Sequence, residues 1–167
     1  MKHPALVIIK PDGINKGLIG NIFTKFAETK LDIIGIRIVK ATRKLAEEHY
    51  KNLKGERFFK EIVLYLSGAL HKNKKIVIIV YHGKDAIKKC RRVAGATNPE
   101  EAAPNTIRGS YGRITTKGIF ENVVHVSSDK EEAKREIKLW FDPDDLLVDL
   151  YSTKTQTEKL KKRRVWA

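Results

Sequence analysis

One histidine and one glutamate in this sequence have the types and the spacing that phosphoryl transfer requires. His125 lies in an apolar, strand-like run that leads directly into an amphipathic helix. In that helix Ala133, Ile137 and Trp140 recur at helical spacing as an apolar stripe, and Glu136 lies at its border. An acid that is half buried requires a partner. If the helix folds back beside the strand, Glu136 can orient the His125 ring, which makes His125 a candidate nucleophile.

The alternative is that both residues have ordinary structural roles. Isolated histidines are more often packed than catalytic, and helix glutamates are more often solvated. The start of the helix is predicted independently of this choice, because Ser128 precedes Glu131 by the three residues of a capping box and acidic residues follow in the first turn. The sequence therefore predicts a helix that begins at Ser128.

Phosphoryl transfer also requires cations and hydrogen-bond donors around the migrating group. Lys10 ends an apolar run, Arg91 lies on a predicted helix, and Thr97 and Arg108 lie in and just beyond a loop with two prolines. Each residue alone would be an ordinary surface residue. Together, and flanking the strand of His125, they suggest a phosphate site, although the sequence has neither a Walker loop nor a glycine-rich kinase loop.

The elements that must position these residues alternate between strands and helices. Strands are predicted for three runs rich in branched apolar residues, 5–9, 31–41 and 76–81. Helices are predicted where apolar residues recur at helical spacing, at 17–26, 44–53, 57–66 and 85–94. Pro11 and Gly13 predict a loop after the first strand. This order favours an α/β or α+β domain, and β-α-β-β-α-β is one arrangement consistent with it.

Length and composition are those of one globular domain. The chain has 167 residues, of which 41% are hydrophobic and 32% are charged. No apolar run is long enough to span a bilayer, and the N-terminus lacks a signal-peptide cleavage pattern, so a cytoplasmic location is expected. The single cysteine, Cys90, cannot form an intrachain disulfide, which fits a reducing compartment.

The strong positive charge predicts attraction to polyanions. There are 34 Lys and Arg against 20 Asp and Glu, a formal charge of +14. Charge alone does not distinguish nucleotides, nucleic acid and membrane surfaces. Part of it lies in the run from Lys154 to Arg164, which predicts a solvated or partly helical tail, with a dedicated anionic partner as the alternative.

Seven segments of the chain, in order and at compatible spacing, resemble the nucleoside diphosphate kinase family. They are Val7–Gly13, His49–Tyr50, Arg57–Phe59, Gly95–Pro99, Thr106–Gly109, Asn122–His125 and Glu136–Phe141. The match covers residues 5–148. It implies an α+β fold, a ferredoxin-like βαββαβ antiparallel sheet with helices packed on it, in a homo-oligomer that is a tetramer or a hexamer. Residues 1–150 would then be the catalytic domain and residues 151–167 a basic C-terminal extension.

The resemblance also implies roles for the candidate residues. His125 would take the terminal phosphate of a nucleoside triphosphate and pass it to a nucleoside diphosphate in a ping-pong reaction. Glu136 would orient the ring and Ser127 would support that carboxylate. The residues on the phosphate side would be Lys10, Tyr50, Arg91, Thr97 and Arg108.

The remaining roles concern the nucleoside and the metal. Lys10 and Asn122 would lie near the ribose hydroxyls. Phe58 would stack on the base, with Ile62 on the other side, and aromatic stacking accepts any base. Mg²⁺ would arrive bridging the phosphates of the nucleotide, because it is poorly suited to a cage made of protein ligands alone.

Several positions depart from the family pattern. Val126 and Ser128 replace a small residue and an aspartate after the histidine, and Ala96 replaces the glutamate before Thr97. The stretches 71–75 and 111–121 are longer than expected. These departures bear on turnover rate and on the type of oligomer more than on the reaction itself.

Two other classes of function compete with the enzyme. The first is a nucleotide- or nucleic-acid-binding protein that keeps the pocket and has lost efficient catalysis. The second is a protein that docks through its basic tail on an acidic partner or a membrane surface. Because every expected reacting residue is present, the sequence favours the enzyme. Nucleic acid is compatible with the charge but is not a predicted partner, and no membrane association is predicted.

Overall fold

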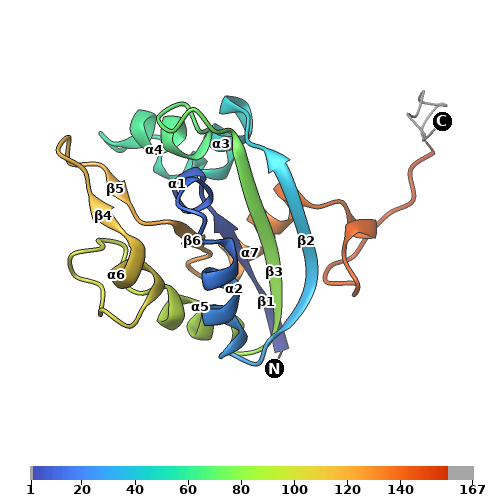
Figure 1. Cartoon of the computed structure of the whole chain (residues 1–167). Coiled ribbons are helices and arrows are strands. Elements are labelled where there is room, and N and C mark those ends of the chain that lie inside the picture. The colour runs from blue at the N-terminus through green and yellow to red at the C-terminus, as the bar shows by residue number, and fades with distance from the viewer. Residues whose placement is uncertain (1, 158–167) are drawn as a thin grey trace, which may run out of the picture.

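The computed structural model describes residues 2–157, and its centre is a four-stranded antiparallel sheet (Figure 1). The strand order is β2-β3-β1-β6. The strands are β1 (Lys2–Ile9), β2 (Asp32–Lys40), β3 (Lys75–Lys84) and β6 (Val124–Val126). The first and third strands along the chain are therefore central neighbours, and the last strand pairs with the first. This is the expected ferredoxin-like βαββαβ arrangement, and that prediction is confirmed.

Helices cover both faces of the sheet. One face carries α1 (Pro11–Asn15), α2 (Ile19–Ala27), α5 (Ala86–Ala94) and α6 (Ile107–Tyr111). The other face carries α3 (Arg43–His49), α4 (Phe59–Leu66) and α7 (Lys130–Trp140). In β1, Val7 and Ile9 belong to the first core while Leu6 and Ile8 belong to the second. Because both faces are covered, this strand is a continuous apolar run rather than an alternating one.

Two local predictions about helices are corrected by the structure. The predicted loop after β1 is the short helix α1, because Pro11 occupies a first-turn position at which its missing N–H costs nothing. The cap of α7 is Asp129 rather than Ser128. The Asp129 carboxylate accepts a hydrogen bond from the Glu132 backbone N–H at 2.9 Å, while the Ser128 hydroxyl donates to that carboxylate.

The predicted helix at 44–53 is divided into two parts. Helix α3 ends at His49, and the 3₁₀ turn η1 (Lys51–Leu53) follows it. The other predicted strands and helices are present, with ends that differ by a few residues.

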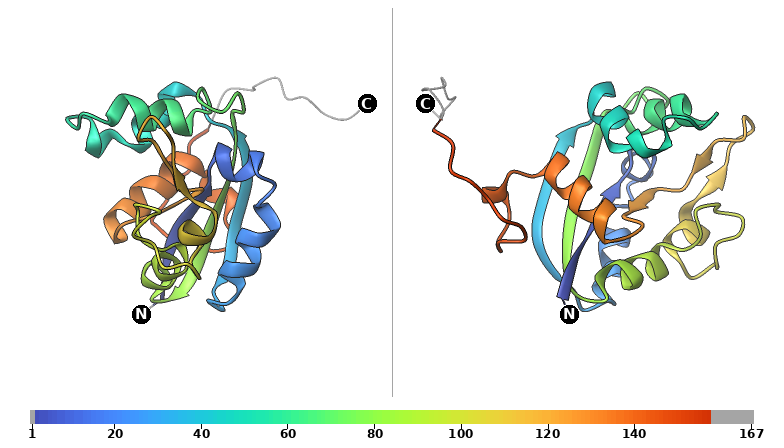
Figure 2. Two further views of the ribbon diagram at one scale, coloured as in Figure 1. Left: turned by 60° about the vertical axis from the view of Figure 1, so that its left-hand side comes forward. Right: turned by 180° about the vertical axis from the view of Figure 1, so that it is seen from behind.

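The long stretch 111–121 contains a small hairpin that projects from the body of the protein (Figures 1 and 2). Its strands are β4 (Arg113–Ile114) and β5 (Phe120–Glu121), with two paired positions between them. The hairpin comes directly before β6, which begins at Val124. Its base is therefore continuous with the strand that carries His125.

After α7 the chain crosses to the edge strand β2. The 3₁₀ turn η2 (Pro143–Asp145) follows, and the Leu147 N–H donates to the Ile34 carbonyl at 2.8 Å. The last part of the described chain leads away from the domain (Figure 2). Most of the basic run from Lys154 to Arg164 lies outside the described residues. Within residues 2–157, no helix has the length and hydropathy needed to cross a membrane.

Candidate active site

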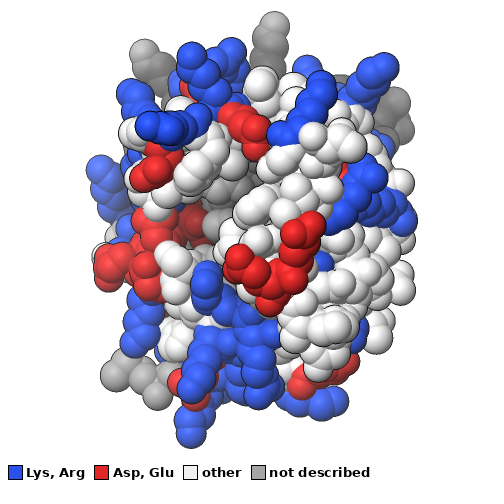
Figure 3. Space-filling view, turned by 90° about the vertical axis from the view of Figure 1, so that its left-hand side faces the viewer, with Lys and Arg blue, Asp and Glu red and all other residues white. Residues whose placement is uncertain are grey.

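A cleft of about 580 Å³ brings together almost all the candidate residues. It opens on the face from which α4 and the β4–β5 hairpin project, and Figure 3 shows this face hollowed at its centre, with Lys and Arg side chains gathered below the hollow. Its lining includes ten of the eleven residues selected from the sequence, Lys10, Tyr50, Phe58, Ile62, Arg91, Thr97, Arg108, Asn122, His125 and Glu136. The eleventh, Ser127, lies behind Glu136.

The histidine and the glutamate meet as the helix–strand geometry requires. His125 lies on β6 opposite Ile8 of β1, and its side chain is 18% exposed. Its Nε2 lies 2.7 Å from Glu136 Oε1, and the Ser127 hydroxyl donates to Glu136 Oε2 at 2.6 Å. Because a carboxylate only accepts, the imidazole proton is on Nε2. The Nδ1 atom of His125 therefore keeps its lone pair.

Lys10 is a buried cation at the end of β1. Its Nζ donates to Asn122 Oδ1 at 2.7 Å and lies 4.8 Å from the centre of the Tyr65 ring. Burial, with the nearby Arg108 guanidinium, lowers the pKa of Lys10 to about 7, although Asp12 acts in the opposite direction. An anion in the cleft would favour the charged form of this side chain.

The segment that follows Lys10 holds the approach to β6 in a strained conformation. Val123 has φ 54°, which is costly for a β-branched residue. Its N–H donates to Asp12 Oδ2 at 3.1 Å, and its carbonyl accepts from the Lys10 N–H at 2.9 Å. A side chain at Gly13 would come within 3.2 Å of the Val123 carbonyl. The Lys-Pro-Asp-Gly motif therefore fixes the chain two residues before His125.

Arg108 is the second buried cation of the cleft. Its guanidinium donates to the Gly95 carbonyl at 2.8 Å and to the Val124 carbonyl at 3.0 Å. Burial, with the neighbouring Arg91, lowers the pKa of Arg108 to about 10. Gly95 has φ +86°, and a Cβ there would lie 2.3 Å from Thr106 Oγ1, so only glycine fits beside this arginine.

Comparison with known proteins identifies the family. A family model described as nucleoside diphosphate kinase matches residues 3–146. The nucleoside diphosphate kinase of Pyrococcus furiosus is 43% identical over 141 residues, which are 84% of each chain. That of Saccharolobus islandicus is 41% identical over 140 residues, 84% of this chain and 95% of the relative.

This chain belongs to the nucleoside diphosphate kinase family. Solved structures agree with this assignment. The enzyme of Aquifex aeolicus superposes with a TM-score of 0.78 at 34% identity, covering 87% of this chain and 99% of the other. The Halobacterium salinarum enzyme in complex with CDP has the same TM-score and identity, with coverage of 87% and 91%. The chain is a phosphotransferase that moves the terminal phosphate of a nucleoside triphosphate to a nucleoside diphosphate through a phosphorylated histidine.

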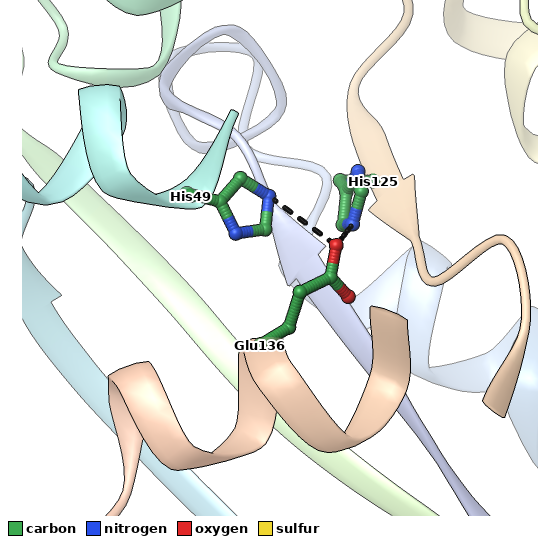
Figure 4. Close-up of side chains that lie close together, drawn as sticks. All are labelled: His49, His125 and Glu136. Carbon is green, nitrogen blue, oxygen red and sulfur yellow. Dashed lines mark hydrogen bonds and ion pairs between the residues drawn. The ribbon is translucent and has the colours of Figure 1, made fainter. Parts of the chain in front are cut away.

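A second histidine of this kinase, His49, was not selected from the sequence. It is buried at the end of α3, with its ring centre 4.5 Å from that of His125 (Figure 4). Trp140 Nε1 lies 3.2 Å from His49 Nδ1, and an indole N–H only donates, so the His49 proton is on Nε2, 3.9 Å from Glu136 Oε1. Burial, followed by the nearby His125, lowers the pKa of His49 well below its usual value. His49 is therefore a neutral ring whose N–H faces the Glu136 carboxylate.

These three residues do not form a good metal site, although their positions suggest one. One ligand atom each from His49, His125 and Glu136 lies within 4.8 Å of the others. A metal on His49 Nε2 would require the proton on Nδ1, where it would oppose the Trp140 N–H. The hydrogen bond from Trp140 thus favours the neutral Nε2–H form over metal binding.

Tyr50 follows His49 and caps α3 at the inner wall of the cleft. Burial, together with the Glu136 carboxylate, raises the pKa of its hydroxyl. Tyr50 therefore stays protonated and is available as a donor. Asn122 is held on the opposite side by the Thr97 carbonyl, which accepts from Asn122 Nδ2 at 2.8 Å.

The outer end of the cleft is apolar and exposed. Phe58 is 48% exposed at the start of α4, and Ile62 follows it by four residues on the same helix. Both residues line the cleft, and their expected positions on either side of a base stay a prediction. The hairpin adds two apolar residues to the lining, Ile119 and Phe120, which were not selected from the sequence.

The departures next to His125 are accommodated locally. Val126 is buried in the core on the α5 side of the sheet, and it also contributes to the lining of the cleft beside His125. Ser128 donates to the helix-capping Asp129. Ala96 is exposed. None of the three substitutions breaks the hydrogen bonds that hold His125 and Glu136.

Proposed function

We propose that His125 is the residue of this kinase that carries the phosphate, with Nδ1 as the attacking atom. The observation that supports the assignment is the Glu136 hydrogen bond to Nε2, because it leaves the Nδ1 lone pair available on the cleft side. In the first step the lone pair attacks the terminal phosphorus, and the bond to the bridging oxygen breaks. The nucleoside diphosphate leaves with that oxygen. In the second step an oxygen of another diphosphate attacks the phosphorus and releases His125.

The buried network behind His125 stabilises the ring as it gains positive character. Glu136 accepts the Nε2–H, and Ser127 holds the other carboxylate oxygen, so the carboxylate cannot rotate away. Around the phosphates we propose Lys10, Arg91, Thr97, Arg108 and Tyr50. Fixed donors and cations of this kind stabilise charge that develops in the transition state. Asn122, held by Lys10 and Thr97, is placed to reach the ribose hydroxyls.

The apolar outer end would hold the base, stacked on Phe58 and flanked by Ile62. Stacking on an exposed ring tolerates any base, so broad acceptance of nucleosides is expected. The Halobacterium salinarum relative was solved with CDP, and the Borrelia burgdorferi relative, 29% identical with a TM-score of 0.78 and coverage of 91% and 93%, was solved with vanadate and ADP.

We propose that Mg²⁺ reaches this site bound to the nucleotide. Three carboxylates line the cleft, and two of them are engaged: Glu136 with His125 and Ser127, and Glu132 with Arg135. The described residues of the cleft therefore offer too few free oxygen ligands for a protein cage. Bound through the phosphates, the ion would neutralise part of their charge.

We also propose a homo-oligomer, either a tetramer or a hexamer. Edge strand β2 exposes large apolar side chains, of which Ile38 is 70% exposed, and exposed apolar edges favour association. Mass measurement in solution decides the number of subunits. The division into a catalytic domain at 1–150 and an extension at 151–167, and the cytoplasmic location, stay predictions.

Labelling with radioactive ATP tests the assignment of His125. With Mg²⁺ present, the protein should acquire a phosphate that is labile in acid and stable in base, and added nucleoside diphosphate should remove it. His125→Ala should stay unlabelled, while His82→Ala, at the far end of the sheet, should label normally. Equal labelling of His125→Ala would refute the assignment.

Negligible transfer with steeply salt-dependent affinity for nucleic acid would favour the binding-protein alternative. EDTA should prevent labelling.

A further inference from the structure

The two stretches that are longer than expected contact each other. Residues 71–75 belong to the turn at 68–75 that leads into β3, and residues 111–121 contain the β4–β5 hairpin. The contact is made by His71 of the turn and Glu121 of the hairpin, whose side chains are 3.0 Å apart. Glu121 is buried, and its carboxylate also accepts from Arg113 Nε at 2.6 Å. Since a carboxylate only accepts, His71 donates through Nε2–H.

The hairpin needs such a support. It has only two paired positions, and a two-stranded ribbon is marginally stable by itself. Two contacts join Glu121 of the hairpin to the body of the protein. One is the contact with His71, and the other is a longer ion pair between Lys16 Nζ and Glu121 Oε2 at 3.8 Å.

The turn that carries His71 is itself fixed to the body. Its backbone folds tightly at Gly68, whose carbonyl accepts from the N–H groups of His71 and Asn73. The His71 carbonyl accepts from Asn15 Nδ2 at 3.0 Å, and Asn73 donates to Asn15 Oδ1 at 2.6 Å. The His71 ring packs against Tyr65, with 5.1 Å between centres. A rigid turn thus presents one donor to the hairpin.

We propose that His71 is a positioning residue for nucleotide binding: its bond to Glu121 sets where the hairpin residues Ile119 and Phe120 stand in the cleft. Those residues line the same cleft as Phe58. The inference rests on the proposed function, in which the base lies at that end. Burial acts to raise the pKa of Glu121, but the hydrogen bonds from Arg113 and His71 outweigh it and hold that pKa below its usual value. Glu121 is therefore an anionic anchor, and the residue after it is Asn122.

Two substitutions in the full chain separate the hydrogen bond from the packing. His71→Phe keeps a ring against Tyr65 and removes the donor, whereas His71→Gln keeps a donor and removes the ring. His71→Phe should weaken ADP binding and raise KM for nucleoside diphosphates about tenfold, as expected for loss of a hydrogen bond to a charged group. Its kcat should stay within about a factor of two, because His125 is untouched. His71→Gln should bind ADP nearly as wild type does, and the control His82→Ala should bind ADP with wild-type affinity.

Amide hydrogen exchange tests whether the weaker binding of ADP in His71→Phe comes from a loosened hairpin. Residues 113–121 should exchange faster in His71→Phe, while the amides of β1 and β3 keep their protection. The inference is overturned if His71→Phe binds ADP as wild type does, if His71→Gln is as weak as His71→Phe, or if kcat falls while KM does not. A wild-type protein that binds ADP without transferring phosphate would refute the proposed function alone, because the His71 comparison is read from ADP affinity.

Discussion

The two ends of the cleft are built in opposite ways. At the inner end His125, Glu136 and Ser127 are joined by hydrogen bonds of 2.6 and 2.7 Å, and two of the three side chains are almost fully buried. At the outer end Phe58 is 48% exposed and Phe120 is 38% exposed. The inner end comes from the sheet and α7, whereas the outer end comes from the start of α4 and a small hairpin.

This difference matches the two tasks in the proposed function. Transfer of phosphate requires one ring in one orientation and one tautomer, which only a buried and satisfied network provides. Acceptance of many nucleosides requires an apolar surface that makes few directed bonds. Substitutions at the inner end should therefore change kcat, and substitutions at the outer end should change KM.

The largest effect should come from Glu136→Ala. Removing the carboxylate leaves His125 Nε2 without an acceptor, so the ring loses both its fixed tautomer and its charge stabilisation. We expect the rate of phosphorylation by ATP to fall about a hundredfold or more. Rapid-quench measurement of the phosphoenzyme provides the rate. Glu132→Ala, one turn earlier on α7, serves as the control and should have a much smaller effect. A Glu136→Ala enzyme that is phosphorylated at the wild-type rate would show that the inner network is only structural.

Phe58→Ala tests the outer end. Loss of the ring should raise KM for every nucleoside diphosphate about tenfold, and kcat at saturation should be nearly unchanged. Leu64→Ala is the matched control, because Leu64 is exposed on the same helix and does not line the cleft. Steady-state kinetics with purine and pyrimidine acceptors provides the comparison. A fall in kcat for one base only would mean that the outer end takes part in the chemical step.

Lys10 lies between the two ends and should link binding to pH. Its pKa of about 7 in the free enzyme means that most copies are neutral at about pH 8, whereas bound phosphate favours the charged form. Binding of ADP should therefore take up a proton, and affinity should fall about fivefold between pH 7 and pH 8. Calorimetry in buffers of different ionisation enthalpy measures the uptake. Lys10→Met should bind more weakly and without this dependence; a wild-type enzyme with no proton uptake would show that Lys10 is already charged.

The lowered pKa of Lys10 also determines the direction in which the stability of the free enzyme changes with pH. Between about pH 7 and pH 10.5 the unfolded lysine holds more protons than the folded one, so the free enzyme should become more stable as pH rises through that window. Urea unfolding of wild type and Lys10→Met isolates this contribution.

The sequence was sufficient for the elements and for the inner end because both are local patterns. The apolar run of β1 and the stripe of α7 specify which faces are buried. Glu136 follows His125 by only 11 positions and lies about two turns into α7. The error at the cap of α7 was small. Ser128 and Asp129 are both good caps, and only the backbone geometry decides between them.

The tautomer of His49 and the position of the hairpin could not be predicted, because they depend on contacts between segments that are distant in the sequence. The tautomer of His49 is set by Trp140, 91 positions later in the chain. The hairpin is held by His71, 50 positions before Glu121. No periodicity in either segment indicates the partner. The hairpin residues Ile119 and Phe120 also line the cleft, and they come from a part of the chain that carries little hydrophobic pattern.

The smallest effect should come from behind the inner end, at Trp140→Phe. Without the indole N–H, His49 can move its proton to Nδ1 and turn an Nε2 lone pair toward the Glu136 carboxylate, which would disturb the orientation of His125. We expect kcat to fall about threefold, as for one indirect hydrogen bond, with KM unchanged. Phe141→Leu is the control, because Phe141 is the next residue in the same core and should lower stability without lowering kcat. Equal kcat losses in both variants would mean that packing, rather than the His49 tautomer, is what the inner end requires.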